Sequence, residues 1–408
     1  MLTPFFETES STSPSTPTTM PSTSSSLLTS PSSLLSSSSI STTTSTTSSS
    51  SSTTTSTTSS TTTGESCNLL LNQVTYSVGT RPQAVAVADV NSDNKPDIIA
   101  ANYGSNTVGI LLNVGNGTFN PQTNYTVGSN PLSVVVVDVN SDTKLDIIVA
   151  NSGSNTVGVL LNTGNGTFNA QTNYLVGSYP WSVAVADVNS DNKPDIIAAN
   201  YGLNTVGILL NMGNGTFNAQ TTYLVGTNPI SVAVVDVNSD ATPDIIVANL
   251  GSSTVGVLLN TGNGTFNAPT NYTVSSGPRS VAVVDVNGDN KPDIIVALLS
   301  SYTVSVLLNA GSGTFNAPTT YAVSTNPISV AVVDVNSDNK PDIVVANDGS
   351  NTVSILLNVG NGTFSAQTTY LVGNLPLSVA VVDVNSDNKP DIIVANANSN
   401  TVSVLLHC

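Results

Sequence analysis

The sequence predicts an all-β protein, a seven-bladed β-propeller behind an N-terminal tail, and three observations lead to this fold. First, a nine-residue acidic loop recurs seven times at a constant interval of 49 residues, with its first Asp at 89, 138, 187, 236, 285, 334 and 383. Second, each unit contains four short runs rich in β-branched residues, and no segment keeps a helical period. Third, the two ends of the repeated region complement each other.

One unit shows how the four strands are expected to follow one another. Strands A, B, C and D are predicted at residues 182–187, 195–200, 205–211 and 222–225, each bounded by Gly, Asn or Pro. The acidic loop joins A to B, and a Gly-Asn-Gly turn joins C to D. Four strands in a unit of about 40–50 residues is the pattern of a propeller blade.

The ends of the repeated region predict a closed ring. The last unit stops after its C strand at residues 401–406 and lacks a D strand, whereas residues 75–78 align with the D strand at 124–127. We therefore expect the N-terminal strand to complete the last blade. An open solenoid would instead carry polar capping repeats, and the sequence shows none.

The chain is expected to divide into a tail at residues 1–65 and the propeller at residues 66–408. Ser, Thr and Pro dominate the tail, and residues 41–63 are Ser or Thr without exception. Such a segment buries too little apolar surface to fold, so it is predicted to be disordered. It is either an O-glycosylated stalk or an unmodified linker.

Composition excludes several classes of function. The 408 residues include 8 Lys and Arg against 25 Asp and Glu, for a net charge of −17, which argues against nucleic-acid binding. One His and two Cys leave little from which to build a catalytic triad or a zinc site. No run of about 18 apolar residues codes for a membrane span. We therefore expect no enzyme activity, no nucleic-acid partner and no membrane span.

Each acidic loop follows the pattern D-x-N-x-D-x-x-x-D. Side chains at positions 1, 3, 5 and 9 and the carbonyl at position 7 supply the oxygen ligands that Ca²⁺ prefers. The alternative is a loop that only caps its own backbone. Against this, three carboxylates within nine residues repel one another without a cation. The predicted ligands of up to seven Ca²⁺ ions are Asp89, Asn91, Asp93, Asp97, Asp138, Asn140, Asp142, Asp146, Asp187, Asn189, Asp191, Asp195, Asp236, Asn238, Asp240, Asp244, Asp285, Asn287, Asp289, Asp293, Asp334, Asn336, Asp338, Asp342, Asp383, Asn385, Asp387 and Asp391.

Position 6 of such a loop usually needs a left-handed backbone, which Gly and Asn tolerate best. Five of the seven loops have Asn there, but loop 2 has Thr143 and loop 4 has Ala241. These two loops are expected to bind Ca²⁺ most weakly.

The loop, the apolar strand after it and the Gly-Thr-Phe-Asn-Ala-Pro segments at 264–269 and 313–318 resemble the FG-GAP or VCBS-type repeat of integrin α-subunit heads and many secreted proteins. The resemblance covers residues 66–408 and implies a seven-bladed propeller with Ca²⁺ in its A–B hairpins. Asn120 and Asn267 depart from the motif, which has Gly at that place. No integrin leg or membrane anchor is visible, so the resemblance does not imply integrin function.

Differences among the seven units concentrate at the B–C and D–A connections. Aromatic and Arg side chains in loops are common anchors of recognition, so the candidate ligand-binding residues are Tyr179, Trp181, Tyr201, Arg279 and Tyr302. The alternatives are drift on an unconstrained surface, or packing of Trp181 between blades.

We expect a calcium-binding, non-catalytic module for binding or adhesion that acts as a monomeric ring on a protein or glycan ligand. A calcium-stabilised lectin is the alternative.

The expected localisation is extracellular or the cell surface, although no signal peptide is visible at the start of the sequence. The only two cysteines fit this expectation. At the 49-residue offset, Cys67 aligns with Asn116 and Cys408 aligns with Val114, which lie two residues apart in one C–D turn. We therefore predict a disulfide between Cys67 and Cys408 that closes the ring, with two unpaired terminal thiols as the alternative.

Overall fold

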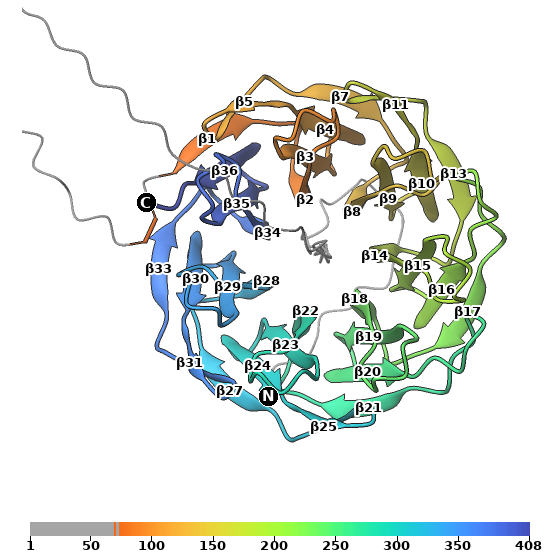
Figure 1. Cartoon of the computed structure of the whole chain (residues 1–408), viewed down its shortest axis with the longest axis vertical. Helices are drawn as coiled ribbons and strands as arrows, with labels where there is room; N and C mark the ends of the chain where they lie inside the picture. Colours follow the sequence, from red (N-terminus) through yellow and green to blue (C-terminus); the bar gives the residue numbers. More distant parts are fainter. Residues whose placement is uncertain (1–68, 71–72) are drawn as a thin grey trace, which may run out of the picture.

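The computed structural model describes residues 69–70 and 73–408, so the expected tail at 1–65 lies outside the described residues. Seven four-stranded antiparallel sheets stand around a central axis as the blades of a propeller (Figure 1). The described residues form strands and turns and contain no helix. The predicted all-β, seven-bladed fold is confirmed.

Four strands make each blade, and the first of them lies nearest the axis (Figure 1). The inner A strands are β2 (Pro82–Ala88), β8 (Pro131–Val137), β14 (Pro180–Ala186), β18 (Pro229–Val235), β22 (Pro278–Val284), β28 (Pro327–Val333) and β34 (Pro376–Val382). The B strands are β3 (Asp97–Asn102), β9 (Asp146–Asn151), β15 (Asp195–Asn200), β19 (Asp244–Asn249), β23 (Asp293–Leu298), β29 (Asp342–Asn347) and β35 (Asp391–Asn396). The C strands are β4 (Thr107–Leu111), β10 (Thr156–Leu160), β16 (Thr205–Leu209), β20 (Thr254–Leu258), β24 (Thr303–Leu307), β30 (Thr352–Leu356) and β36 (Thr401–Leu405). The outer D strands are β7 (Thr123–Thr126), β13 (Thr172–Leu175), β17 (Thr221–Leu224), β21 (Thr270–Thr273), β27 (Thr319–Ala322), β33 (Thr368–Leu371) and β1 (Val74–Ser77).

The N-terminal strand completes the last blade, as predicted. The sheet of blade 7 has the order β1-β36-β35-β34, and Val74 pairs with Val404 while Ser77 pairs with Thr401. The outer strand of this blade thus comes from the opposite end of the propeller region. This pairing closes the ring, because it covers the edge that strand β36 would otherwise leave unpaired.

The C–D connection is more than the expected turn, because it folds back on itself as a small hairpin. Four blades have regular two-stranded hairpins: β5 (Asn113–Gly115) with β6 (Thr118–Phe119), β11 (Asn162–Gly164) with β12 (Thr167–Phe168), β25 (Asn309–Gly311) with β26 (Thr314–Phe315), and β31 (Asn358–Gly360) with β32 (Thr363–Phe364). Blades 3 and 4 keep single bridges at the same places, Asn211 to Phe217 and Asn260 to Phe266. The Asn-Gly pair at the tip is the preferred composition of such a turn.

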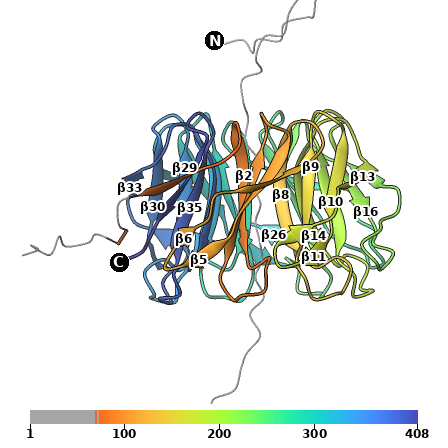
Figure 2. The same ribbon diagram turned by 90° about the horizontal axis from the view of Figure 1, so that it is seen from above.

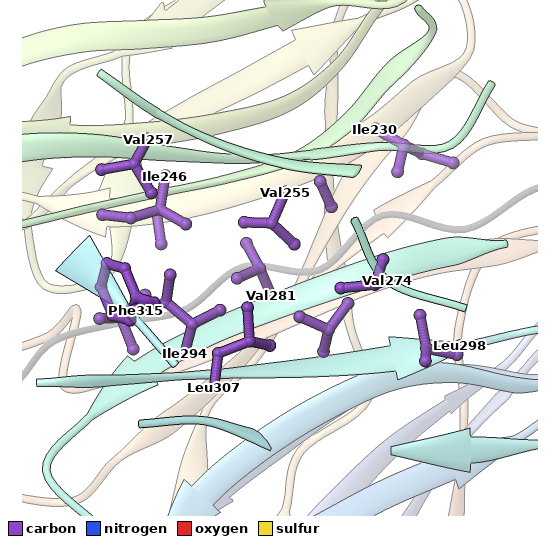
Figure 3. Close-up of a cluster of buried hydrophobic side chains, with 14 of the residues drawn as sticks. Ile230, Ile246, Val255, Val257, Val274, Val281, Ile294, Leu298, Leu307 and Phe315 are labelled. Atoms are coloured by element: carbon purple, nitrogen blue, oxygen red, sulfur yellow. The ribbon is translucent and has the colours of Figure 1, made fainter. Parts of the chain in front are cut away.

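The hydrophobic core lies between blades, where neighbouring sheets pack face to face. Every B strand is buried along its whole length, which explains its unbroken apolar sequence. Figure 3 shows one interface, in which Ile246 and Val257 of blade 4 lie near Ile294 and Phe315 of blade 5. Burial on both faces of each sheet is what fixes the blades against one another.

Aromatic pairs add a second contact between blades near the rim. Tyr76 of β1 meets Phe119 of β6 edge to face, with ring centroids 5.2 Å apart, and its hydroxyl donates to the carbonyl of Gly117 at 3.2 Å. The same Tyr–Phe contact recurs in five more pairs, from Tyr125 and Phe168 to Tyr321 and Phe364. Pairs of this kind contribute about 0.5–1.5 kcal/mol beyond burial alone.

Candidate metal loops and binding face

The two faces of the ring carry different charges. The acidic A–B loops and the small hairpins lie on one face, which we name the loop face, and Figure 2 shows the hairpins β5–β6 and β11 on the same side of the ring. The chain has 22 Asp and 6 Lys, and all of these except Asp348 lie in the acidic loops. The two Arg of the chain, Arg81 and Arg279, lie with Asp348 toward the other face, which we name the connection face.

Loop 3 illustrates how the acidic loops are built. The carboxylate of Asp187 accepts hydrogen bonds from the backbone N–H groups of Asp191 at 3.1 Å and Asn192 at 2.7 Å. The amide oxygen of Asn189 accepts from the N–H of Asp191 at 3.1 Å. Lys193 contacts the Asp191 carboxylate at 3.1 Å from its ammonium group, and five of the seven loops have this ion pair. The loop thus folds tightly around its own acidic side chains.

The backbone at position 6 is left-handed in every loop, as predicted. Asn94 and Asn192 have φ of 62° and 60°, and Thr143 and Ala241 are held at 69° and 67°. Position 4 is left-handed as well, which the sequence analysis missed although Ser or Gly occupies it in every loop. Because Thr and Ala adopt this conformation with strain, loops 2 and 4 are the strained members of the set.

The Asp at position 9 is fully buried and ties the loop to the blade. In loop 3, Asp195 accepts from the N–H of Val188 at 3.1 Å and from the N–H of Asn211 at 2.8 Å. Burial raises the pKa of Asp195 to about 6; the two N–H donors lower it, and the nearby Asp191 and Asp187 carboxylates raise it further. Burial raises the pKa of the same residue in every other loop, to about 6 for Asp97, Asp146 and Asp244.

An Asn at the end of each C strand carries this link to the neighbouring blade. The side-chain amide of Asn211 donates to the carbonyl of Val139 in blade 2 at 2.8 Å and to that of Pro194 at 2.9 Å. Five other blades repeat the bond. Blade 7 has His407 at this place, and both ring nitrogens of His407 are buried without a hydrogen-bond partner. This network was not predicted from the sequence. The repeat nevertheless indicates it, because six units have Asn and one has His at the same place in the 49-residue alignment.

Across residues 69–70 and 73–408, no three carboxylate, thiolate or imidazole side chains are gathered as a metal-binding cluster. The loops instead hold their carboxylates on backbone N–H groups. The donor set of each loop, three carboxylates with an amide oxygen and a carbonyl, nevertheless matches a hard cation in its chemistry. Calcium binding by the 28 loop residues therefore stays a prediction.

The structure corrects the expected places of two candidate ligand-binding residues. Trp181 and Arg279 lie in the inner strands β14 and β22 rather than in D–A loops, and they are only 7% and 2% exposed. Each occupies the residue at which the pairing of A and B strands shifts register. This irregularity lies inside the inner strand, where the sequence pattern suggested a loop.

The tyrosines predicted at the connections lie where expected, with different degrees of exposure. Tyr179 and Tyr302 are 50% and 45% exposed, in the D–A and B–C connections respectively. Both have a φ of 55°, a left-handed backbone. Asn occupies the place of Tyr302 in five of the six other blades and the place of Tyr179 in three, as Asn351 and Asn130 do. Tyr201 is half-buried and packs against Trp181, with ring centroids 5.1 Å apart.

The register-shift residues of the seven inner strands occupy equivalent places in the blades, and we name them, together with three residues of the B–C turns, the axial cluster. Its members are Gln83, Leu132, Trp181, Ile230, Arg279, Ile328, Leu377, Tyr103, Tyr201 and Asp348. Leu132, Trp181 and Ile230 pack in one hydrophobic cluster with the two tyrosines. Arg279 of blade 5 interacts electrostatically with Tyr201 of blade 3 and Asp348 of blade 6, so the cluster joins blades that are not neighbours.

The fold and its loops define a class, a seven-bladed propeller whose every blade carries an acidic A–B loop. The model of the FG-GAP-like repeat matches the sequence at residues 89–149, 138–198, 187–247, 236–296, 285–345 and 334–394. The chain therefore belongs to the FG-GAP repeat family. A search of curated proteins found no match.

Solved structures share the architecture at low sequence identity. BBS1N in complex with ARL6DN is similar with a TM-score of 0.60 at 11% identity, over 83% of this chain and 97% of that chain. Virginiamycin B lyase from Staphylococcus aureus has a TM-score of 0.58 at 13% identity, over 82% of this chain and 98% of the lyase. A functionally unknown protein from Desulfotomaculum acetoxidans has a TM-score of 0.53 at 13% identity, over 80% and 92%. At these identities the likeness shows the fold alone.

The described part of the chain contains no helix with the length and hydrophobicity to cross a bilayer.

Proposed function

We propose that this FG-GAP propeller is a calcium-binding, non-catalytic module that acts outside the cell or at its surface and binds a protein partner on the connection face. The observation that carries the proposal is the pair Tyr179 and Tyr302. Each places a half-exposed aromatic ring on a left-handed backbone that Asn would adopt with less strain. Strain at an exposed residue that packing does not require is a mark of a functional position.

Calcium would be held on the loop face. In loop 3 the ligands would be Asp187, Asn189, Asp191, the carbonyl of Lys193 and Asp195, and the other loops would use the equivalent residues. A bound cation would neutralise carboxylates that burial and mutual repulsion now destabilise, which is why the raised pKa of Asp195 supports this role. The ion would act structurally, since the loops are tied to the blades through the buried Asp.

A protein partner is favoured because exposed aromatic rings provide large, rigid contact areas for protein recognition. The similar BBS1N fold was solved with a protein bound, which is a precedent for the architecture only. The tilted ring pair of Trp181 and Tyr201 supports the second candidate, a lectin, since aromatic rings also suit the apolar face of a sugar ring. A non-catalytic role is supported by the placement of acids, which lie in the loops apart from Asp348.

Capture of extracellular matrix proteins and glycans from arrays tests the proposal. The full chain should bind a partner in calcium. Tyr179→Asn and Tyr302→Asn install the residue that three and five other blades, respectively, have at the equivalent place. Both variants should lose that partner at least tenfold while melting at the same or a higher temperature. Asn130→Tyr in the Tyr179→Asn background is the matched control, since it adds a ring in blade 2 and should not restore binding. A partner retained by both Asn variants, or lost after mutation of the Asn-Gly-Thr tips, would place recognition elsewhere.

A further inference from the structure

The outer strands of blades 1 and 4 carry a motif that the proposed function does not use. Residues 124–126 in β7 and 271–273 in β21 both read Asn-Tyr-Thr, which matches Asn-X-Ser/Thr, the acceptor motif for N-linked sugars. Residues two apart in a strand point to the same side. Asn124 and Thr126 are accordingly both exposed, whereas Tyr125 packs against Phe168 of the next blade. The strand thus presents the whole motif at the rim of the ring.

The blade architecture does not require this motif. Asn occupies the place of Asn124 in blades 1, 2 and 4, and Thr occupies it in the other four. Two residues further along, the place of Thr126 is taken by Leu, Ala or Ser in five blades. Leu175 at that place is 79% exposed, so packing does not select the side chain there. Asn and Thr occur together only in blades 1 and 4, which indicates a use outside the fold.

The hairpin tips contain the same motif, but there the hairpin itself explains it. Five tips read Asn-Gly-Thr; Asn-Gly is the preferred pair for the turn, and the Thr118 hydroxyl donates to the carbonyl of Gly115 at 2.6 Å. Blade 5 has Ser312 in place of the Asn, and Thr314 keeps the bond, to Gly311 at 2.7 Å. The tip Thr is therefore present even without the motif, so only the two strand motifs lack a structural reason.

Asn124 also lines a hollow, which we name the seam hollow because it lies where blade 7 meets blade 1. The hollow has a volume of about 370 Å³, within the range of about 300–1,000 Å³ for small-molecule sites. Its other lining residues are Val78, Gly79, Thr80, Ser105, Thr107 and Asn400. Their side chains offer hydroxyl and amide groups beside one Val and carry no charge, so the lining suits a neutral molecule rich in hydroxyl groups.

Hydrogen bonds hold the polar groups of the seam hollow in place. The Thr107 hydroxyl donates to the side-chain oxygen of Asn124 at 3.4 Å, and the Asn124 side-chain nitrogen makes no hydrogen bond to any described residue. The side-chain oxygens of Ser105 and Asn400 each accept from a backbone N–H of the connection between β1 and β2, at 2.7 Å and 2.8 Å. The nitrogen that an N-linked sugar requires is thus free, and the Ser105 hydroxyl and the Asn400 amide keep donors for the sugar.

We propose that Asn124 carries an N-linked glycan whose first sugar, an N-acetylhexosamine, lies in the seam hollow. The inference rests on the proposed location outside the cell. The sugar would come from a lipid-linked sugar pyrophosphate: the bond between its anomeric carbon and the pyrophosphate oxygen breaks, and the anomeric carbon bonds to Nδ2 of Asn124. The amide nitrogen gives up one proton, and the lipid pyrophosphate leaves. Asn271 is a second acceptor with the same motif in blade 4.

Peptide mass spectrometry of the full chain, directed into the secretory route of cultured eukaryotic cells, tests the modification. Asn124 should carry a glycan in most molecules. Asn124→Gln and Thr126→Ala should abolish it, and Thr126→Ser should retain it, because the motif accepts either hydroxyl. Leu175→Thr completes the motif of Asn173 in blade 2 and should add a glycan there, since the motif would then stand on an equivalent outer strand.

Release of the glycan by peptide N-glycanase tests its place in the seam hollow. Ser105→Leu should fill the hollow and should fold, because blade 3 has Leu203 at this place. Release from the native protein should be at least tenfold slower in the unchanged chain than in Ser105→Leu, and the two rates should be equal after denaturation. Ser154→Leu, the same exchange in blade 2, is the control and should leave the release from Asn124 unchanged.

Three results would overturn the inference. An unmodified Asn124 in the secreted chain would remove the glycan, and an Asn124 modified equally in Thr126→Ala would mean that a different reaction modifies it. Equal release from the native unchanged chain and from native Ser105→Leu would remove the sugar from the hollow. If Asn124 stays unmodified while a partner is captured through Tyr179 and Tyr302, only this inference fails. If Asn124 is modified and no partner is captured before or after deglycosylation, only the proposed function fails.

Discussion

Leu70 and His407 form an antiparallel β-bridge between the two ends of the propeller. This bridge takes the place of the contact between Asn211 and Phe217 in blade 3, so the last blade builds its small hairpin from two separate chain ends. The N–H of Cys408 donates to the carbonyl of Leu69 at 3.1 Å, as that of Met212 does to Thr216. The seam of the ring therefore lies within one C–D hairpin.

His407→Asn should stabilise the protein. The Asn side chain would restore the bond that six blades make to a neighbouring carbonyl, here that of Val335, and would remove two buried nitrogens without partners. A gain of about 1 kcal/mol in the free energy of unfolding is expected from one such hydrogen bond, measured by chemical denaturation. The reverse change in blade 6, Asn358→His, should lose a similar amount. A destabilised His407→Asn protein would show that the Asn network does not bind the blades together.

A disulfide between Cys67 and Cys408 should hold this seam closed. Cys67 lies outside the described residues, so the bond stays a prediction, but Leu69 and Cys408 already meet in the structure. Reduction or Cys408→Ser should lower the melting temperature. The loss in the free energy of unfolding has an upper bound of about 6 kcal/mol for a crosslink that closes so long a loop. Hydrogen exchange should then rise first in residues 73–80 and 400–408. Detection of two free thiols in native protein isolated from an oxidising compartment would contradict the predicted disulfide.

Calcium should raise the melting temperature strongly. Each site that binds only the folded state contributes about 2.7 kcal/mol when calcium exceeds its dissociation constant a hundredfold. Asp191→Ala should remove one equivalent of bound calcium in equilibrium dialysis, whereas Asp240→Ala should change less because loop 4 is strained at Ala241. Identical melting curves in calcium and in EDTA would contradict the prediction that the acidic loops bind calcium.

Thr143→Asn and Ala241→Asn should relieve the strain of loops 2 and 4. Both residues are held at a left-handed φ, 69° and 67°, that Asn adopts more easily. Each change should add about 0.5–1 kcal/mol to the free energy of unfolding and tighten calcium binding at its own loop. Asn192→Ala is the matched reverse change in loop 3 and should cost a similar amount. If all three variants are as stable as the unmodified protein, the residue at position 6 does not determine the strain of the loop.

Acid should stabilise the metal-free protein in the range in which the buried Asp residues titrate. The pKa is raised from 3.8 to about 6 for Asp97, Asp146, Asp195 and Asp244, so the folded protein binds more protons than the unfolded chain between these values. Stability in EDTA should therefore fall as the pH rises from about 4 to about 6. In calcium the trend should reverse, because the cation binds the ionised carboxylates. Asp195→Asn should weaken the dependence in EDTA, and an EDTA sample that melts higher at pH 7 than at pH 5 would contradict it.

The sequence alone determined the repeat, and the repeat determined the fold. A constant 49-residue spacing, four apolar runs per unit and a D strand displaced to the N-terminus leave few arrangements other than a closed ring. The left-handed backbone at position 6 of each loop was also predictable, because Asn and Gly mark such positions by their local chemistry. These features are local or periodic, so a single sequence is enough to predict them.

Tertiary structure alone decided which side chains are buried and which meet across blades. Trp181 and Arg279 looked like loop residues, but a register shift in strands β14 and β22 places them in the axial cluster. The electrostatic interaction of Arg279 with Tyr201 and Asp348 involves three blades, and no linear spacing encodes it. Closure of the ring brings equivalent residues to one level around the axis, so the identity of each partner follows from the geometry of seven blades rather than from the sequence of any one.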